Sequence, residues 1–103
     1  MDKILEIGNK QIIRGLVLMI AEAAGINGAS LELIKTALKP HGYNIEKDEV
    51  MMVCQYLEGK GLIRIETFKN EVLKISRDIA YIMPDGIDVL EGTMKVDGIN
   101  LRG

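Results

Sequence analysis

The sequence is poor in the side chains on which disulfides, metal sites and nucleophilic catalysis depend. It has one cysteine, Cys54, and one histidine, His41. A single cysteine forms no internal disulfide, and a structural zinc site made of protein side chains draws four ligands mainly from these two residue types. We therefore expect no disulfide and no structural metal, and a protein that works in the reducing cytoplasm.

Long apolar runs and an excess of positive charge are also missing. The longest apolar run, Gly15–Ala21, lies between Arg14 and Glu22 and is far shorter than the roughly 18 to 20 residues that a membrane-spanning helix needs. Lys and Arg number 13 against 15 Asp and Glu, a formal net charge of −2. We expect no membrane association. Bulk charge does not attract this chain to nucleic acid, so any DNA contact must be local.

No group of residues converges on a catalytic mechanism. A nucleophile needs a neighbouring base, but His41 sits in a Pro-His-Gly turn and Cys54 falls on the apolar side of a predicted helix. The carboxylates of Asp85, Asp88 and Glu91 fit the solvated face of a short amphipathic helix. We therefore expect no enzyme, no cofactor and no small-molecule substrate.

The amount of apolar sequence fits one compact domain. The chain has 103 residues, of which 48% are hydrophobic, enough for one core. We predict a single domain over residues 1–103. Within it, residues 1–8 are expected to form an N-terminal arm, residues 9–92 the core and residues 93–103 a loose C-terminal tail.

Hydrophobic periodicity predicts three helices in the first part of the chain. The first is expected over residues 9–24 with Asn9 as its N-cap. The second follows a turn and a short extended stretch, begins at the N-cap Ser30 and stops near Lys39, before a proline. The third is expected over residues 47–58. Its core side is predicted to consist of Val50, Val53, Cys54 and Leu57.

After the third helix the period of the apolar residues changes to two, which predicts a β-hairpin. The first strand is expected to begin at Leu62, and the second is expected to span residues 72–83. The apolar positions of the second strand change parity near Arg77 and Asp78, which predicts a bulge or bend.

A short helix over residues 84–91 is expected to bury Ile87 and Leu90. The predicted fold class is therefore mainly α with a small β-hairpin (α+β). Three helices followed by a two-stranded wing are the element order of a winged helix-turn-helix, here with a short C-terminal helix added.

Several segments of the chain resemble winged-helix proteins. The stretch YLEGKGLI, residues 56–63, is similar to the junction of helix and wing in bacterial winged-helix transcription regulators. Residues 11–99 as a whole resemble the small winged-helix proteins that prophages of Mu-like phages encode. The matching pieces are LKPHGYNI, YLEGKGLI, ISRDIAYI and PDGIDVLEGT followed by DGI.

This resemblance implies a DNA-binding transcription regulator of phage or prophage type. The third helix is then expected in the major groove of double-stranded DNA and the wing on phosphates. A homodimer would place two such domains on two half-sites. The residues implied are Lys47, Asp48, Met51, Met52 and Gln55 on the helix and Lys69, Lys74 and Arg77 on the wing.

The charges of these two elements differ from each other. Residues 46–58 carry four carboxylates against one lysine and no arginine for bidentate guanine contact. Gln55 is the best donor and acceptor there for an adenine. Residues 64–77 carry four cations against two carboxylates, which either contact phosphates or solvate an exposed strand edge.

A second class of function stays open, a winged-helix module that binds a protein and no DNA. In this interpretation Met51, Met52 and Tyr56 form the partner interface. Methionine suits adaptable binding surfaces, and aromatic side chains are enriched at interfaces.

Overall fold

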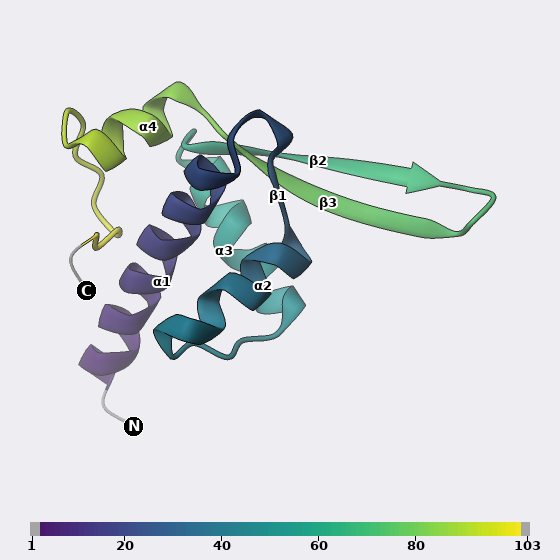
Figure 1. Cartoon of the computed structure of the whole chain (residues 1–103). Coiled ribbons are helices and arrows are strands. Elements are labelled where there is room, and N and C mark those ends of the chain that lie inside the picture. The colour runs from purple at the N-terminus through teal and green to yellow at the C-terminus, as the bar shows by residue number, and fades with distance from the viewer. Residues whose placement is uncertain (1–2, 102–103) are drawn as a thin grey trace.

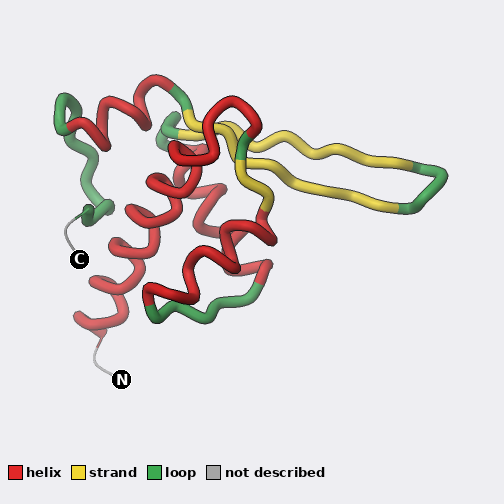
Figure 2. Tube along the Cα trace, in the orientation of Figure 1, coloured by secondary structure: helices red, strands yellow, loops and turns green. Residues whose placement is uncertain are grey.

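Four α-helices and a three-stranded antiparallel sheet make up residues 3–101, which the computed structural model describes (Figures 1 and 2). The α+β class predicted from the sequence is confirmed. The elements are α1 (Lys3–Ala24), a 3-10 turn (Gly25–Asn27), β1 (Ala29–Ser30), α2 (Leu31–Leu38), a 3-10 turn (Lys39–His41), α3 (Lys47–Gly59), β2 (Ile63–Asn70), β3 (Ile75–Ile82) and α4 (Pro84–Glu91). Among the described residues, no helix has the length and apolar composition to cross a membrane.

The first helix is longer than the sequence pattern predicts. It begins at Lys3, so the expected N-terminal arm is wrong from that residue on, and residues 1–2 lie outside the described part of the chain. Asn9 is inside the helix and is not its N-cap. The segment before Asn9 contains Lys, Leu and Glu, which are good helix formers, and this propensity outweighs the cap signal of one asparagine.

The second helix begins and ends where its capping residues predict. The backbone N–H of Leu33 donates to Oγ of Ser30 at 3.1 Å, which confirms Ser30 as the N-cap. The same residue ends β1, so the short extended stretch before the helix is also confirmed. After Leu38 the chain tightens into the 3-10 turn and reverses at Gly42, whose φ is +90°.

The core lies where α1, α2 and α3 meet the inner face of the sheet (Figure 1). From α3 it receives Val50, Cys54 and Leu57, all 0% exposed, as the helical pattern predicts. Val53, expected on the same side, is half-buried and lines a groove between α3 and α1. The other buried residues are Val17, Leu18, Ala21, Ala29, Leu31, Ile34, Leu38, Leu62, Ile63, Ala80 and Val89.

The hairpin has no bulge. The strand order is β1-β3-β2, and β2 pairs with β3 without a break from Ile63 opposite Ile82 to Asn70 opposite Ile75. The second strand starts at Ile75, later than predicted. Residues 66–77 are all exposed, so no core selects one face there, and the parity of the apolar residues carries no information about the backbone.

The last helix turns a different face inward than the sequence predicts. Ile87 is 37% exposed, whereas Gly86 and Val89 are buried and Leu90 is half-buried against the core. A Cβ atom at position 86 would overlap the carbonyl oxygen of Leu62, so this glycine lets α4 approach the start of β2 closely. That contact sets the rotation of the helix.

The C-terminal segment, expected to be a loose tail, lies along α1 as far as it is described (Figure 1). Nη1 of Arg14 donates to the carbonyl oxygen of Gly98 at 3.0 Å, and the N–H of Asn100 donates to the carbonyl oxygen of Gln11 at 3.0 Å. Four apolar side chains of this segment are partly buried and pack against the core. They are Met94, Val96, Ile99 and Leu101.

Candidate nucleic-acid interface

The outward side of α3 carries a short exposed stripe. Asp48, Met52 and Gln55 are exposed, and Met52 is the most open large apolar side chain of the helix at 67%. Their spacing of three and four residues places them on one face. Gln55 therefore lies where it can reach an external partner. Met51, predicted to share this surface, is half-buried instead.

Lys47, the lysine predicted to contact DNA from α3, forms an ion pair within the protein. Its Nζ lies 2.9 Å from Oε2 of Glu32 on α2. The hydrogen bond from Lys47 is the main cause that holds the pKa of the Glu32 carboxyl below its ordinary value, and the charges of Lys47 and Arg77 contribute. A second pair, between Lys35 and Glu46 at 3.5 Å, also joins α2 to the start of α3. Three of these four side chains are exposed and Lys35 is half-buried, so the two pairs contribute little to the stability of the domain.

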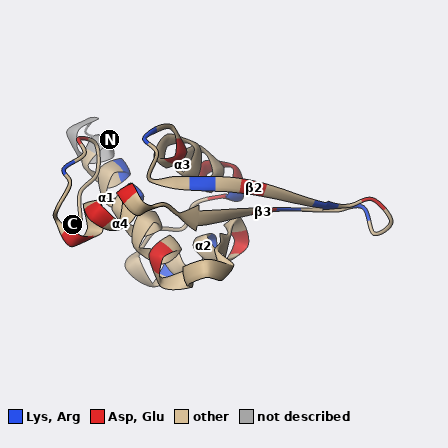
Figure 3. Ribbon diagram, turned by 90° about the horizontal axis from the view of Figure 1, so that it is seen from above, with Lys and Arg blue, Asp and Glu red and all other residues tan. Residues whose placement is uncertain are grey.

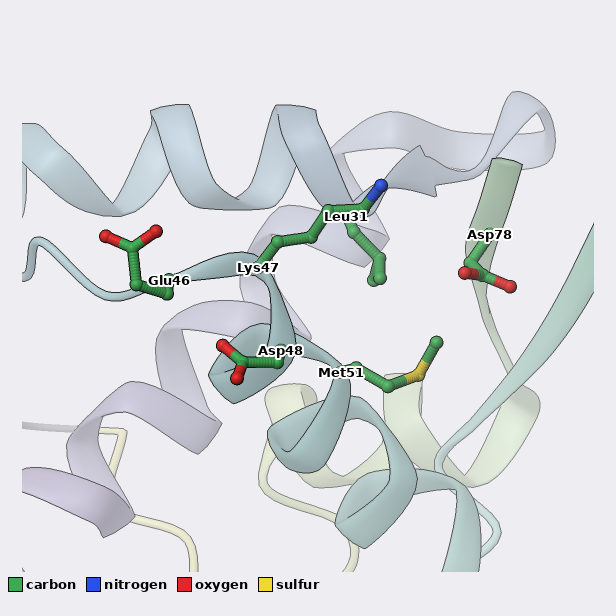
Figure 4. Close-up of a pocket in the computed structure, with 6 residues that line it drawn as sticks. All are labelled: Leu31, Glu46, Lys47, Asp48, Met51 and Asp78. Atoms are coloured by element: carbon green, nitrogen blue, oxygen red, sulfur yellow. The ribbon is translucent and has the colours of Figure 1, made fainter. Parts of the chain in front are cut away.

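A hollow of about 520 Å³ opens between the start of α2, the start of α3 and β3 (Figure 4). It is lined by Leu31, Glu46, Lys47, Asp48, Met51 and Asp78. Asp78 accepts a hydrogen bond from Oγ1 of Thr67 across the hairpin at 2.5 Å. Three carboxylates against one lysine make this hollow unfavourable for a phosphate. In the described part of the chain, no cluster of three or more His, Cys, Asp or Glu side chains could hold a metal ion.

The hairpin carries the positive charge that α3 lacks (Figure 3). Near its base, Arg64 is engaged, because its guanidinium lies 4.3 Å from the ring centre of Tyr81 and pairs with Glu66. Further out, the side chains of Lys69, Lys74 and Arg77 form no ion pair with the described residues. Lys69 and Lys74 are therefore free to meet an external anion, and Arg77, whose charge also acts on Glu32, forms no direct ion pair that would prevent it.

Lys69, Lys74 and Arg77 do not share one face of the hairpin. Lys69 pairs with Ser76 across the strands, and Arg77 pairs with Phe68. Because neighbouring residues of a strand point to opposite faces, Lys69 and Arg77 lie on opposite sides of the ribbon. Lys74 belongs to the turn and has a φ of +53°, unusual for a residue with a side chain. The hairpin therefore presents positive charge on both faces and at its tip.

The residues proposed as a protein interface are also divided. Met52 and Tyr56 line a groove of about 310 Å³ between α3 and α1. Its other lining residues are the apolar Ile13, Ile45 and Val53 and the charged Lys10, Arg14 and Glu49. Met51 instead lines the hollow on the other side of α3. The expected patch of Met51, Met52 and Tyr56 is thus not continuous.

Tyr56 has an internal role that the sequence pattern missed. The guanidinium of Arg14 lies 3.7 Å from its ring centre, and its hydroxyl donates to the carbonyl oxygen of Asp97 at 3.5 Å. A Cβ atom at position 98 would overlap this hydroxyl, so a glycine at this position lets the C-terminal segment lie against the Tyr56 side chain. Arg14, Tyr56 and Gly98 are far apart in the sequence, and no local signal links them.

The two residues considered for nucleophilic chemistry lie in different environments. Cys54 is fully buried in the core, and desolvation, reinforced by the negative charge of Glu58, raises the pKa of its thiol to about 12. His41 is exposed in the turn after α2. The cysteine is therefore protonated and inaccessible at neutral pH.

Comparison with known proteins identifies no family for this chain. No protein-family model matches the chain. No curated protein matches its sequence.

Proposed function

We propose that this chain is a cytoplasmic DNA-binding transcription regulator of phage or prophage type with a winged-helix architecture. One observation carries the proposal. Residues 66–77 of the hairpin project beyond the helices and carry Lys69, Lys74 and Arg77, none of which forms an ion pair with a described residue (Figures 1 and 3).

In this proposal α3 reads the major groove and the hairpin binds phosphates. The exposed amide of Gln55 can address an adenine through both its donor and its acceptor. Met52 offers apolar contact to a thymine methyl group. Lys47 already pairs with Glu32, so the affinity comes mainly from the hairpin. Two domains in a homodimer double this modest footprint.

The hairpin charge gives the first test. We expect Lys74→Ala to weaken binding to all duplex sequences alike and to reduce the slope of log K against log salt by about 0.9, the effect of one lost phosphate contact. The measurement is a fluorescence anisotropy titration of duplex DNA at several salt concentrations. Lys95→Ala, which removes an exposed lysine of the C-terminal segment, is the matched control and should leave the slope unchanged. Equal slopes for Lys74→Ala and wild type would contradict phosphate binding by the hairpin.

A second candidate function is a protein-interaction module, and the groove between α1 and α3 favours it. The groove has a volume of about 310 Å³, and Met52 at its wall is 67% exposed. A side chain from a partner could bury this methionine.

Met52→Glu separates the two functions. If the groove binds a partner or a second copy, a buried unpaired carboxylate should dissociate the complex while the domain stays folded, because Met52 points away from the core. Light scattering over a concentration series measures association, and a DNA titration accompanies it. Leu33→Glu, at an exposed position of α2, is the control. Lost association with unchanged DNA binding would support the groove as an interface and contradict base reading by Met52.

A further inference from the structure

The tip of the hairpin is apolar, although a solvated turn favours polar residues. Val72 is 90% exposed and Leu73 is 65% exposed. Beside them on the strands, Phe68 and Ile75 are 50% and 51% exposed. No packing within the domain depends on these exposed side chains. The apolar tip therefore has no structural role in the chain itself.

The turn holds these side chains in a defined conformation. Oδ1 of Asn70 accepts a hydrogen bond from the N–H of Leu73 at 3.0 Å, and the ladder continues to the last pair, Asn70 opposite Ile75. Lys74 adopts the left-handed conformation that reverses the chain. A tip ordered in this way pays little conformational entropy when it binds.

The charges around the tip indicate what it binds. Between residues 68 and 77 there are three cations and one carboxylate, Glu71. Lys69 lies on one face of the ribbon and Arg77 on the other. Each is within three residues of the turn, which consists of residues 71–74. A groove of DNA has a phosphate backbone on both sides, so it can engage both faces at once.

Size restricts how far the hairpin enters such a groove. The minor groove of B-DNA is about 6 Å wide, and two paired strands are already about 4.8 Å apart before their side chains are added. The ribbon as a whole is too wide, whereas one or two side chains at its end fit. The exposed part of β2, Glu66–Asn70, gives the tip a reach of about 17 Å beyond the globule.

We propose that Val72 and Leu73 form an apolar wedge that enters the minor groove, unstacks a base step and bends the duplex. This inference rests on the proposed DNA binding and adds deformation of the DNA to it. Lys69 and Arg77 hold the phosphates on the two sides of the groove while the wedge contacts the bases. Apolar wedges of this kind bend DNA by about 20° to 90°.

The test compares bending with binding. The full chain is titrated into a duplex of about 30 base pairs with central TA steps, the steps that kink most easily, and with a donor and an acceptor dye at its two ends. Wild type should bind and increase energy transfer. The double variant Val72→Ser, Leu73→Ser should bind with the same salt dependence and leave energy transfer at the value of free DNA. The matched control is Ile26→Ser, which removes another side chain that is 96% exposed, and it should bend the duplex as wild type does.

Different failures have different meanings. Wild type that binds without added energy transfer, or a double variant that bends the duplex as wild type does, overturns the wedge and leaves DNA binding in place. No binding to the duplex at low salt overturns both. Sedimentation with vesicles of phosphatidylserine and phosphatidylcholine is the remaining arm. Binding of wild type to these vesicles, lost in the double variant and without bending of DNA, assigns the tip to a membrane surface and overturns the wedge.

Discussion

Leu57→Ala is expected to lower the free energy of unfolding by about 2 to 5 kcal/mol. Leu57 is 0% exposed and lies in the last turns of α3, where this helix packs on α1 and α2. Its carbonyl oxygen also accepts the N–H of Leu62, so the residue joins the helix to the start of the hairpin. Removing its isobutyl group leaves a cavity that the backbone there cannot close.

Urea denaturation followed by circular dichroism measures this loss. Leu33→Ala is the control, because Leu33 is 48% exposed on α2 and its truncation leaves the core intact. A change below about 0.5 kcal/mol for Leu57→Ala, as at an ordinary surface site, would show that α3 does not pack as described.

The buried thiol of Cys54 is expected to make the protein unstable in alkali. Burial raises its pKa in the folded state to about 12, from an ordinary value of about 9. Below pH 9 the thiol is protonated in both states and has no effect. Above pH 9 the unfolded chain releases this proton and the folded chain does not, so stability falls by about 1.4 kcal/mol per pH unit until the folded thiol also ionises.

Cys54→Ala isolates this effect from the tyrosines and lysines that titrate in the same range. The measurement is urea denaturation of wild type and Cys54→Ala at several pH values between 8 and 11. The stability of wild type relative to the variant should decline steadily above pH 9. A difference that stays constant over this range would mean that the thiol ionises as easily in the folded protein as in the unfolded chain.

The helices around the core were predictable because each buries an apolar stripe whose period is visible in the sequence. Val50, Cys54 and Leu57 illustrate this on α3, and the hydrogen bond at Ser30 illustrates a local capping signal that tertiary contacts did not override. In both cases the determining interactions lie within one helix turn or on one helix face.

The features that were not predictable depend on contacts distant in the sequence or on the absence of a core. The rotation of α4 follows from Gly86 meeting Leu62, and no periodicity reveals that approach. In the outer hairpin both faces are exposed, so the parity of apolar residues did not report the register.

For the candidate site, the sequence indicated which helix and which hairpin carry the residues, but it did not reveal the contacts that each side chain makes. The exposed Gln55 and the unpaired Lys69, Lys74 and Arg77 lie where the pattern placed them, on the outer side of α3 and on the hairpin. The pairing of Lys47 with Glu32 joins two helices and was not visible from either one alone.

The hydrogen bonds between α1 and the C-terminal segment set the order in which the domain can be completed during synthesis. Arg14 and its acceptor on Gly98 are 84 residues apart, and Asn100 binds back to Gln11. At a translation rate of about 5 to 20 residues per second, α1 waits about 4 to 17 seconds for this partner. During that interval the surface around Gly15, later covered by Asn100 and Leu101, is open to chaperones and to neighbouring nascent chains.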